Sequence, residues 1–314
     1  MSVTVVKAGL LSSLQSRPRL GLRHLGVAAG GAADPLSLAL ANRLVGNAWD
    51  APAIEVTLAG PTLRFDRAMS VAIAGGDAEV QLNGGTVPCH RTVDAAAGDE
   101  LVIGPVVSGV RVYLAVAGGF LAEELLGSAS TSLQAGFGGY AGRALDAGDI
   151  LEGGTMAGAH LETPAAFRPE YASAAALRTC PSVESRWLDE ASRSALYEIN
   201  WTVDRRADRM GLRLTGANLH VASDGRMPSA GVIPGTIQCP EDGRPYILSV
   251  DAGTVGGYPR VAQVARADRH VLGQLRPGEH VRLLPRTAEE AVGELRAKLD
   301  YWREWLPGIN EILA

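Results

Sequence analysis

Lysine is nearly absent from this sequence of 314 residues, in which Lys7 and Lys298 are the only two. The chain therefore has no Gly-Lys-Ser/Thr phosphate loop, no mid-chain lysine for a Schiff base and no lysine in a setting that could carry biotin. The net charge is −5 at pH 7, and no basic tract stands out. These features argue against a nucleic-acid-binding protein.

Cysteine is also scarce, and long apolar runs are missing. The three cysteines, Cys89, Cys180 and Cys239, are far apart and odd in number, which fits a reducing cytosol better than a disulfide framework. Cys239 could be a nucleophile, but we expect it to fill an apolar strand position. The six histidines show no metal-ligand spacing, so we expect no metal site. With no membrane-spanning run and no charged leader, we expect a soluble cytoplasmic protein.

Glycine, by contrast, is abundant at 38 residues, while aromatic residues make up only 5% of the chain. This composition favours short strands joined by tight turns, and the length suits two domains. We predict a mainly β fold with two β-barrel-like domains and a few peripheral helices. The expected divisions are a β-rich barrel domain at 1–165, a second barrel domain at 180–286 and an amphipathic helix at 287–314.

Short apolar and β-branched runs, bounded by Gly, Pro or Asp, recur between residues 51 and 155 and predict strands there. They are 54–58, 63–65, 70–73, 79–82, 100–103 and 110–116. A turn followed directly by a strand also recurs, with the same pattern of glycine and acidic residue at Gly98, Gly148 and Gly278. Such a turn suits the last hairpins of closed barrels, and its presence in both halves indicates two related β units.

Three segments have the signals of helices. Asp34 resembles an N-cap before a proline, leucines then recur every four residues, and Gly46 follows, so we predict a buried helix at 35–45. A second helix is predicted at 184–198. Thr287 and Glu290 form a capping box at the start of the last helix, whose apolar stripe we expect to pack on its own barrel rather than on a partner.

Residues 229–260 look most like a site. Two extended runs, 235–239 and 246–251, flank a turn in which Asp242-Gly243 can supply a positive φ, and the second run opens into a glycine-rich loop. Four polar residues can gather beside these glycines: Gln238, Asp251, Thr254 and Tyr258. An ordinary hairpin with a glycine-rich turn has the same pattern.

Several blocks of this sequence resemble a known family. Residues 234–245 contain Pro-Gly-x-Ile-Gln-x-Pro-x-Asp-Gly-x-Pro, and Gly-Gly-Tyr-Pro follows at 256–259. Further matching blocks are 23–27, 34–36, 41–47, 55–61, 113–119, 127–139 and 208–214. On these blocks the chain resembles the large subunit of the allophanate hydrolase/5-oxoprolinase group, also called biotin-dependent carboxyltransferase-like proteins.

This resemblance implies β-barrel architecture with a cyclophilin-like C-terminal half, and a smaller paralogous partner subunit. It implies ATP-dependent opening of 5-oxoproline to L-glutamate, in which ATP acts at the level of the complex and a separate lactam-opening subunit takes part. Two alternatives remain open. One is carboxyl transfer in a urea carboxylase-type system, for which alone biotin would be needed. The other is a non-catalytic regulatory subunit that binds a small kinase-inhibitor-like partner.

Both activities build up negative charge on an amide-type oxygen, which requires hydrogen-bond donors and a group that moves protons. We assign proton transfer to Asp251 and Tyr258, and amide recognition to Gln238. Glu55 should face inward from a strand, where it either pairs with an arginine or serves the site, and the resemblance favours the site. Arg209 would clamp a carboxylate or a phosphate.

Further candidates for substrate binding are polar residues and paired glycines whose N–H groups could act as donors. They are Asp34, Asn42, Thr254, Gly118, Gly119, Gly138, Gly139, Gly256 and Gly257. Each glycine pair could equally be an ordinary tight turn, and Asn42 could be exposed or could cap a helix.

Two departures from the family pattern bear on activity. Family members usually carry Gln-Asp-x-Gly-Arg near the start, where this chain has Ser16 and Pro18 in place of the aspartate and the glycine. After Asp251, Ala252 and Gly253 stand where bulky polar residues are usual. Either the substrate differs, or this chain has kept the scaffold and lost part of the site.

Overall fold

The structure is a computed structural model that describes residues 1–154, 158–222 and 227–314. The chain divides into two compact units, each discontinuous in sequence. Unit 1 comprises Met1–Arg19, Gly30–Tyr171 and Trp302–Leu313, and unit 2 comprises Leu20–Ala29, Ala172–Tyr301 and Ala314. The domain boundaries that we predicted were continuous in sequence, so they did not include the assignment of Leu20–Ala29 to unit 2 or of Trp302–Leu313 to unit 1.

A curled antiparallel sheet forms the centre of unit 1. Its strands are β1 (Ser2–Lys7), β2 (Leu11–Gln15), β3 (Ala53–Thr57), β4 (Thr62–Phe65), β5 (Met69–Leu82), β6 (Gly85–Thr86), β7 (Thr92–Ala95), β8 (Glu100–Val116) and β9 (Ile150–Glu152). The order β2-β3-β8-β4-β1-β9 is extended by β5, which pairs with β6, β7 and β8. A core of aliphatic side chains that includes Leu14, Ile54 and Leu114 fills its inner face.

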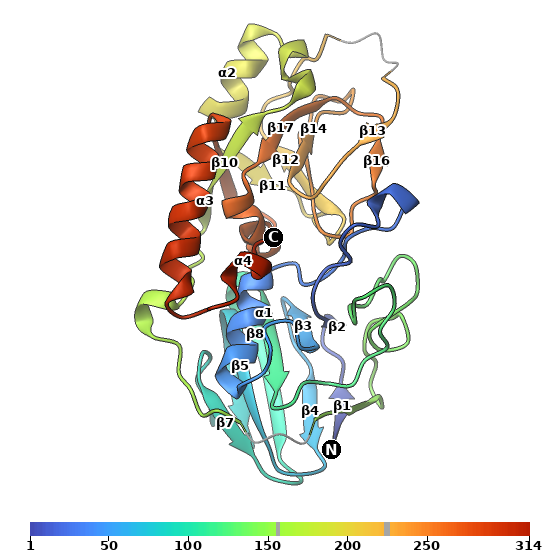
Figure 1. Ribbon diagram of the computed structural model, residues 1–314, viewed down its shortest axis with the longest axis vertical. Helices are drawn as coiled ribbons and strands as arrows, with labels where there is room; N and C mark the ends of the chain where they lie inside the picture. The colour runs from blue at the N-terminus through green and yellow to red at the C-terminus, as the bar shows by residue number, and fades with distance from the viewer. Residues whose placement is uncertain (155–157, 223–226) are drawn as a thin grey trace. The chain divides into compact units, whose positions relative to one another are not determined.

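Helix α1 (Pro35–Val45) packs against β5 and β8 (Figure 1). It begins where the sequence predicted, because Asp34 accepts a hydrogen bond from the backbone N–H of Ser37 and proline occupies the first turn. It ends at Gly46, which adopts a left-handed conformation at φ 81°. The predicted buried helix at 35–45 is therefore confirmed.

Strands β5 and β8 each replace two predicted short strands. Each long strand was predicted as two short ones because glycines, which usually mark turns, lie in the middle of it. Here the glycines bend continuous strands: the register of β5 on β8 shifts on both sides of Asp77, and Gly75 adopts φ 125°. A Cβ at Gly75 would lie 2.6 Å from the Arg111 carbonyl oxygen, so no other residue fits this close approach of the two strands.

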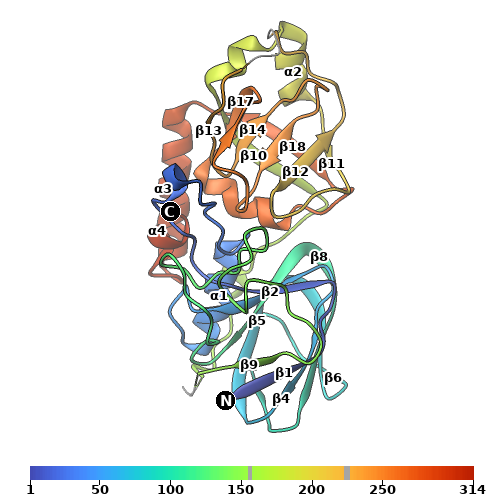
Figure 2. The ribbon, with the colours of Figure 1, turned by 90° about the vertical axis from the view of Figure 1, so that its right-hand side faces the viewer.

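Unit 2 is a closed barrel with the strand order β10-β17-β14-β15-β12-β11-β18 (Figure 2). The barrel closes through β10 and β18, which run parallel to each other. Its core includes Trp201, Ile237 and Leu283. The strands of unit 2 are β10 (Ala174–Pro181), β11 (Trp201–Val203), β12 (Gly211–Thr215), β13 (Ala230–Gly231), β14 (Thr236–Gln238), β15 (Tyr246–Leu248), β16 (Val255–Gly256), β17 (Arg260–Val264) and β18 (His280–Pro285). The predicted fold class, mainly β with barrel-like units and few helices, is confirmed.

The remaining helices differ from the prediction in length. The segment predicted as one helix at 184–198 is a 3-10 turn, η3 (Val183–Trp187), followed by α2 (Glu190–Glu198), because Asp189 caps a new helix by accepting from Ser192 N. The capping box of Thr287 and Glu290 is present, but α3 (Ala288–Arg303) ends before Pro307, and a separate short helix, α4 (Ile309–Ile312), follows. Other short 3-10 turns are η1 (Arg23–Leu25), η2 (Ala165–Phe167) and η4 (Arg266–Gln274).

The repeated turn before a strand is present at all three predicted positions. Gly98, Gly148 and Gly278 have φ values of 89°, 96° and 89°. In each copy the glycine N–H donates to a strand carbonyl, and the next residue's carboxylate accepts from the backbone N–H three residues before it. A strand then begins or resumes. The same local chemistry thus occurs twice in unit 1 and once in unit 2.

Candidate functional site

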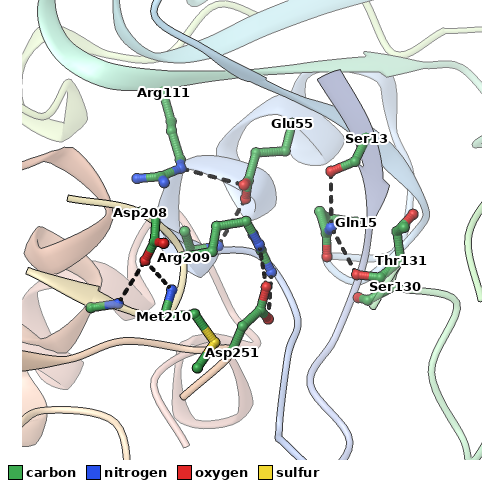
Figure 3. A network of polar contacts seen from close by, with 12 residues as sticks. Ser13, Gln15, Glu55, Arg111, Ser130, Thr131, Asp208, Arg209, Met210 and Asp251 are labelled. Atoms are coloured by element: carbon green, nitrogen blue, oxygen red, sulfur yellow. Dashed lines mark hydrogen bonds and ion pairs between the residues drawn. The ribbon is translucent and has the colours of Figure 1, made fainter. Parts of the chain in front are cut away.

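Glu55 points from β3 into the buried part of unit 1, where its carboxylate contacts Ala33, Tyr113 and Arg111. One carboxylate oxygen accepts from Ala33 N at 2.8 Å and from the Tyr113 hydroxyl at 2.7 Å. The other lies 3.3 Å from Nε of Arg111 (Figure 3). The sequence left open whether Glu55 pairs with an arginine or serves a site, and the structure shows the pairing.

Asp34 lies at the start of α1 and is fully buried. Its carboxylate accepts from the Ser37 hydroxyl at 2.5 Å and from the Tyr171 hydroxyl at 2.8 Å, while its N–H donates to the Tyr113 oxygen at 2.8 Å. Tyr113 therefore joins Asp34 to Glu55. Burial and the neighbouring Glu55 carboxylate raise the pKa of Tyr113 well above its usual value, so its hydroxyl stays protonated and serves as a donor.

Asn42 and the pair Gly118-Gly119 satisfy the backbone around α1. The Asn42 amide donates to the carbonyl oxygens of Trp49 and Ala51, at 3.1 and 2.9 Å. The N–H of Gly118 donates to a side-chain oxygen of the neighbouring Asn47, and that of Gly119 to the Val116 carbonyl. These donors therefore hold the loops after α1 and β8, and the substrate-binding roles of Asn42, Gly118 and Gly119 stay predictions.

The pair Gly138-Gly139 lies in the loop that follows β8, and it too packs against protein atoms. Gly139 N donates to the Glu123 carbonyl, and a Cβ at Gly138 would meet the Ser130 carbonyl at 2.5 Å. Both glycines adopt positive φ, as in a tight turn. The Gly139 N–H thus already has an acceptor within the chain, and the donor role of this glycine pair toward a substrate stays a prediction.

The altered segment near the start is part of a buried polar network in unit 1. The Ser16 hydroxyl accepts from Ala129 N at 3.1 Å, and Ser16 N donates to the Ser130 hydroxyl at 2.8 Å. The Gln15 amide donates to the Ser13 hydroxyl and the Thr131 carbonyl (Figure 3). The serine that replaces the usual aspartate therefore has its own hydrogen-bond partners.

In unit 2, Arg209 and Asp251 form a buried, bidentate ion pair. Arg209 Nε and Nη2 donate to the two Asp251 oxygens at 2.7 and 3.0 Å, and the residues are 5% and 8% exposed (Figure 3). Asp251 N also donates to the Arg209 carbonyl, which extends the pairing of β12 with β15. Arg209 thus holds a carboxylate of its own chain, and its role in holding a carboxylate or a phosphate of a substrate stays a prediction.

Gln238 and Tyr258 line one pocket of about 500 Å³ on the barrel of unit 2. Gln238, Tyr246 and Arg213 are direct cross-strand neighbours on β14, β15 and β12, so their side chains share one face of the sheet. Tyr258 is 51% exposed at the pocket, and its carbonyl accepts from the Gln238 amide at 3.2 Å. The structure thus brings together two of the predicted polar residues.

The predicted glycines and threonine near this pocket have different roles. A Cβ at Gly256 would lie 2.6 Å from the Gln238 amide nitrogen. The Gln238 side chain therefore packs directly against Gly256, and this contact requires glycine at that position. Gly257 lines an adjacent pocket of about 270 Å³, together with Tyr258 and Cys239. Thr254 is half-buried, and its carbonyl accepts from Val232 N. Asp251 lines neither of these two pockets.

Three arginines that sequence reasoning missed also line the larger pocket: Arg206, Arg213 and Arg244. The density of arginine at 205–213 was the available signal, since four of those nine residues are arginine. Cys239, by contrast, is buried, and burial raises the pKa of its thiol to about 12, so it is no nucleophile at neutral pH.

Two negative findings concern only the residues that the structure describes. No group of three or more His, Cys, Asp or Glu side chains in that part of the chain could hold a metal ion. Within the same residues, none of the helices combines the length and the apolar character needed to cross a bilayer.

Comparisons with known proteins agree on one family. The family model described as carboxyltransferase domain, subdomain A and B, matches residues 25–285. The chain is 35% identical over 299 residues to a 5-oxoprolinase subunit of Escherichia coli (strain K12), covering 95% of both proteins. It is 32% identical over 310 residues to urea amidolyase of Saccharomyces cerevisiae, covering 92% of this chain but 17% of that protein.

A solved structure is also similar. The crystal structure of the Kluyveromyces lactis urea carboxylase superposes with a TM-score of 0.89 at 27% identity, over 97% of this chain and 29% of that one. The chain thus spans nearly the whole length of the bacterial 5-oxoprolinase subunit, but only a part of each of the two urea enzymes.

Proposed function

The chain belongs to the carboxyltransferase domain family, subdomains A and B, and from this premise we propose that it is the large subunit of an ATP-dependent hydrolase that opens 5-oxoproline to L-glutamate. The observation that carries this proposal is the pocket in which the Gln238 amide, the Tyr258 phenol and three guanidinium groups stand together. A carboxylated lactam needs these three kinds of partner. The match to the bacterial 5-oxoprolinase subunit over 95% of both chains supports the same choice.

In this proposal each group of the pocket has a chemical task. A guanidinium binds the substrate carboxylate, because its planar donors match the two oxygens. Gln238 pairs with the lactam amide, whose donor and acceptor complement its own. Tyr258 is exposed enough to reach the substrate, and its hydroxyl donates to the lactam oxygen as negative charge builds up there. Asp251 and Arg209 support the adjoining loop rather than the reacting atoms.

Activity in this proposal requires partners. ATP is consumed at the level of a complex with a smaller paralogous subunit and a lactam-opening subunit, since transfer of its γ-phosphoryl group to the lactam oxygen, with release of ADP, converts that oxygen into a leaving group.

The test is the ATP-dependent release of glutamate from 5-oxoproline by the chain purified with its partner subunits. Tyr258→Phe removes only a hydroxyl from a half-exposed side chain, so the complex should form normally while kcat falls by roughly a hundredfold. Tyr301→Phe, on the exposed part of α3, is the matched control and should retain full activity. Equal rates for the two variants would remove Tyr258 from the mechanism.

A second candidate is the carboxyl-transfer step of a urea carboxylase-type system, favoured by the TM-score of 0.89 to the yeast urea carboxylase. In that case the pocket would bind urea, and biotin would arrive on a separate carrier protein. The assay separates the two candidates: turnover of urea with a biotinylated carrier, and none of 5-oxoproline with ATP, favours carboxyl transfer. A tight complex with no turnover of either favours the regulatory role.

A further inference from the structure

Strands β13 and β16, here together called the ribbon, pair with each other in a two-stranded sheet apart from the barrel of unit 2 (Figure 1). Gly256 of the ribbon packs against the Gln238 amide, and β16 leads within two residues to Tyr258 at the pocket. A two-stranded ribbon is only marginally stable in water, so other contacts must hold it in place. The position of the ribbon therefore determines where the Tyr258 side chain stands.

One guanidinium group joins the two strands of the ribbon at the same end. Arg23 Nη2 donates to the Val232 carbonyl at 2.6 Å and to the Gly253 carbonyl at 2.8 Å, and Arg23 Nε donates to Val232 at 3.2 Å. Val232 directly follows β13, Gly253 lies two residues before β16, and Val232 N donates to the Thr254 carbonyl at 3.1 Å. We infer that Arg23 is a positioning residue that fixes the ribbon and, through it, Tyr258 at the pocket. This inference rests on the proposed function for the chemical task of Tyr258.

The charge of Arg23 favours this role over a general contribution to stability. Within the described residues its guanidinium has no ion pair, and its Nη1 is buried without a hydrogen-bond partner. Burial lowers the pKa of the guanidinium, because it disfavours the charged form. Arg260 also contacts the ribbon, through the Gly231 carbonyl at 3.1 Å, but Glu184 neutralises it at 2.8 Å from Nε. A desolvated charge without a counter-ion costs stability, so we assign to Arg23 the placement of the ribbon.

The shape of the guanidinium explains why arginine suits this position. Carbonyl oxygens from two separate segments meet one planar group, whose donors are fixed relative to each other. Glutamine carries its donors on a single nitrogen, so Arg23→Gln should release this end of the ribbon. Arg260 still holds Gly231 in that variant, so we expect the barrel to keep its structure.

Hydrogen–deuterium exchange on the intact chain measures directly how firmly the ribbon is held. In Arg23→Gln we expect the Val232 amide to exchange roughly tenfold faster, because hydrogen bonds to a charged group are lost beside it. The amides of β12 in the barrel should exchange as before. The matched control is Arg193→Gln, which removes an arginine that donates to the Leu188 carbonyl at 3.1 Å elsewhere in unit 2. It should leave exchange at Val232 unchanged.

Kinetics of the complex with 5-oxoproline and ATP test the connection to Tyr258. We expect Arg23→Gln to lower kcat by roughly tenfold to a hundredfold, because misplacing a reacting group by about 1 Å has effects of that order. KM should change by less than about threefold, since the guanidinium groups that line the pocket are unaltered. In a Tyr258→Phe background, Arg23→Gln should cause little further loss of kcat, because both changes act on the same proton donor.

Two outcomes overturn the inference. One is equal exchange at Val232 in Arg23→Gln and Arg193→Gln, and the other is an equal effect of Arg23→Gln on kcat with and without the Tyr258 hydroxyl. Urea denaturation confirms that the variants fold. A complex that releases no glutamate contradicts only the proposed function, because the exchange measurement decides the role of Arg23 without turnover. Turnover that does not depend on Arg23 contradicts only this inference.

Discussion

At the scale of single residues, the ion pair of Arg209 and Asp251 shows how burial changes the role of a charged side chain. Each is at least nine-tenths buried, and the two hydrogen bonds between them are 2.7 and 3.0 Å long. The attraction compensates for the water that both groups have lost. Removing the Asp251 charge alone would take away the carboxylate that accepts both of these hydrogen bonds from the buried Arg209 guanidinium.

Asp251→Asn is therefore expected to lower the free energy of unfolding by about 3 kcal/mol. The measurement is chemical denaturation of the chain, with the slope of the transition checked for a change in the unfolded state. Asparagine has nearly the same shape as aspartate, so lost packing cannot account for the effect.

The control is Glu162→Gln, which breaks the pair between Arg168 and Glu162, where both side chains are more than 40% exposed. It should cost less than about 1 kcal/mol, because solvent screens the pair. Similar costs for the two variants would contradict the argument from burial.

The sequence showed which residue types are candidates for the site, but it did not show which of those residues lie in contact. Gln238 and Tyr258 are near each other in sequence, and the structure brings them to one pocket. Arg209 and Asp251 are 42 residues apart, and only the register of β12 on β15 makes them neighbours. Likewise, that Glu55 contacts Tyr113 depends on the pairing of β3 with β8, which a short-range pattern does not encode.

At the scale of elements, the repeated turn before a strand is the clearest link between sequence and local structure. Gly98, Gly148 and Gly278 all need a positive φ, and a Cβ at any of them would meet no other atom within 4 Å. The recurrence of glycine at these three positions is therefore explained by backbone conformation, with no contribution from crowding.

Alanine at Gly98, Gly148 or Gly278 should accordingly cost about 1–2 kcal/mol of unfolding free energy in each case, since only the left-handed conformation is penalised. Asparagine at the same positions should cost less, because it tolerates that region better. Urea denaturation of the three alanine variants tests whether the three turns are equivalent.

Gly293 supplies a control with the opposite expected sign. It lies inside α3, where a Cβ would also meet nothing within 4 Å, so Gly293→Ala should stabilise the chain by about 0.5–1 kcal/mol. Destabilisation by Gly293→Ala equal to that at Gly278 would show that something other than φ determines the cost.

Local signals predicted the elements that local chemistry controls. The caps of α1 and the capping box of α3 are built by residues three or four apart, so the sequence shows them directly. The long strands β5 and β8 are different, because their continuity through Gly75 comes from the partner strand. A glycine bends a strand that is paired with a neighbour, but it ends a strand that has no partner. The sequence alone does not show which of these two situations applies.

At the scale of the whole molecule, each unit buries a histidine whose neutral form is favoured. Burial lowers the pKa of His90 in unit 1, and burial together with the charges of Lys298 and Arg178 lowers the pKa of His270 well below its usual value. As the pH falls through about 6.5, the unfolded chain binds protons at these histidines before the folded chain does. Folding stability must therefore fall as the pH falls.

We expect the urea midpoint to decrease between pH 7 and pH 5, with up to about 1.4 kcal/mol lost per pH unit for each histidine. His270→Asn should flatten this dependence, whatever it does to stability at pH 7. His220→Asn replaces an exposed histidine and should leave the slope as it was. An unchanged slope in His270→Asn would mean that other groups control acid unfolding.

The closure of the barrel by β10 and β18 has a consequence for the synthesis of the protein on the ribosome. The first strand of the barrel pairs with a strand about a hundred residues later, and unit 1 likewise takes in Trp302–Leu313. At about 5–20 residues per second, β10 precedes its parallel neighbour by on the order of ten seconds. Neither unit can finish folding before its last segment has been synthesised. Early intermediates therefore expose unpaired strand edges, and we expect chaperones to bind them.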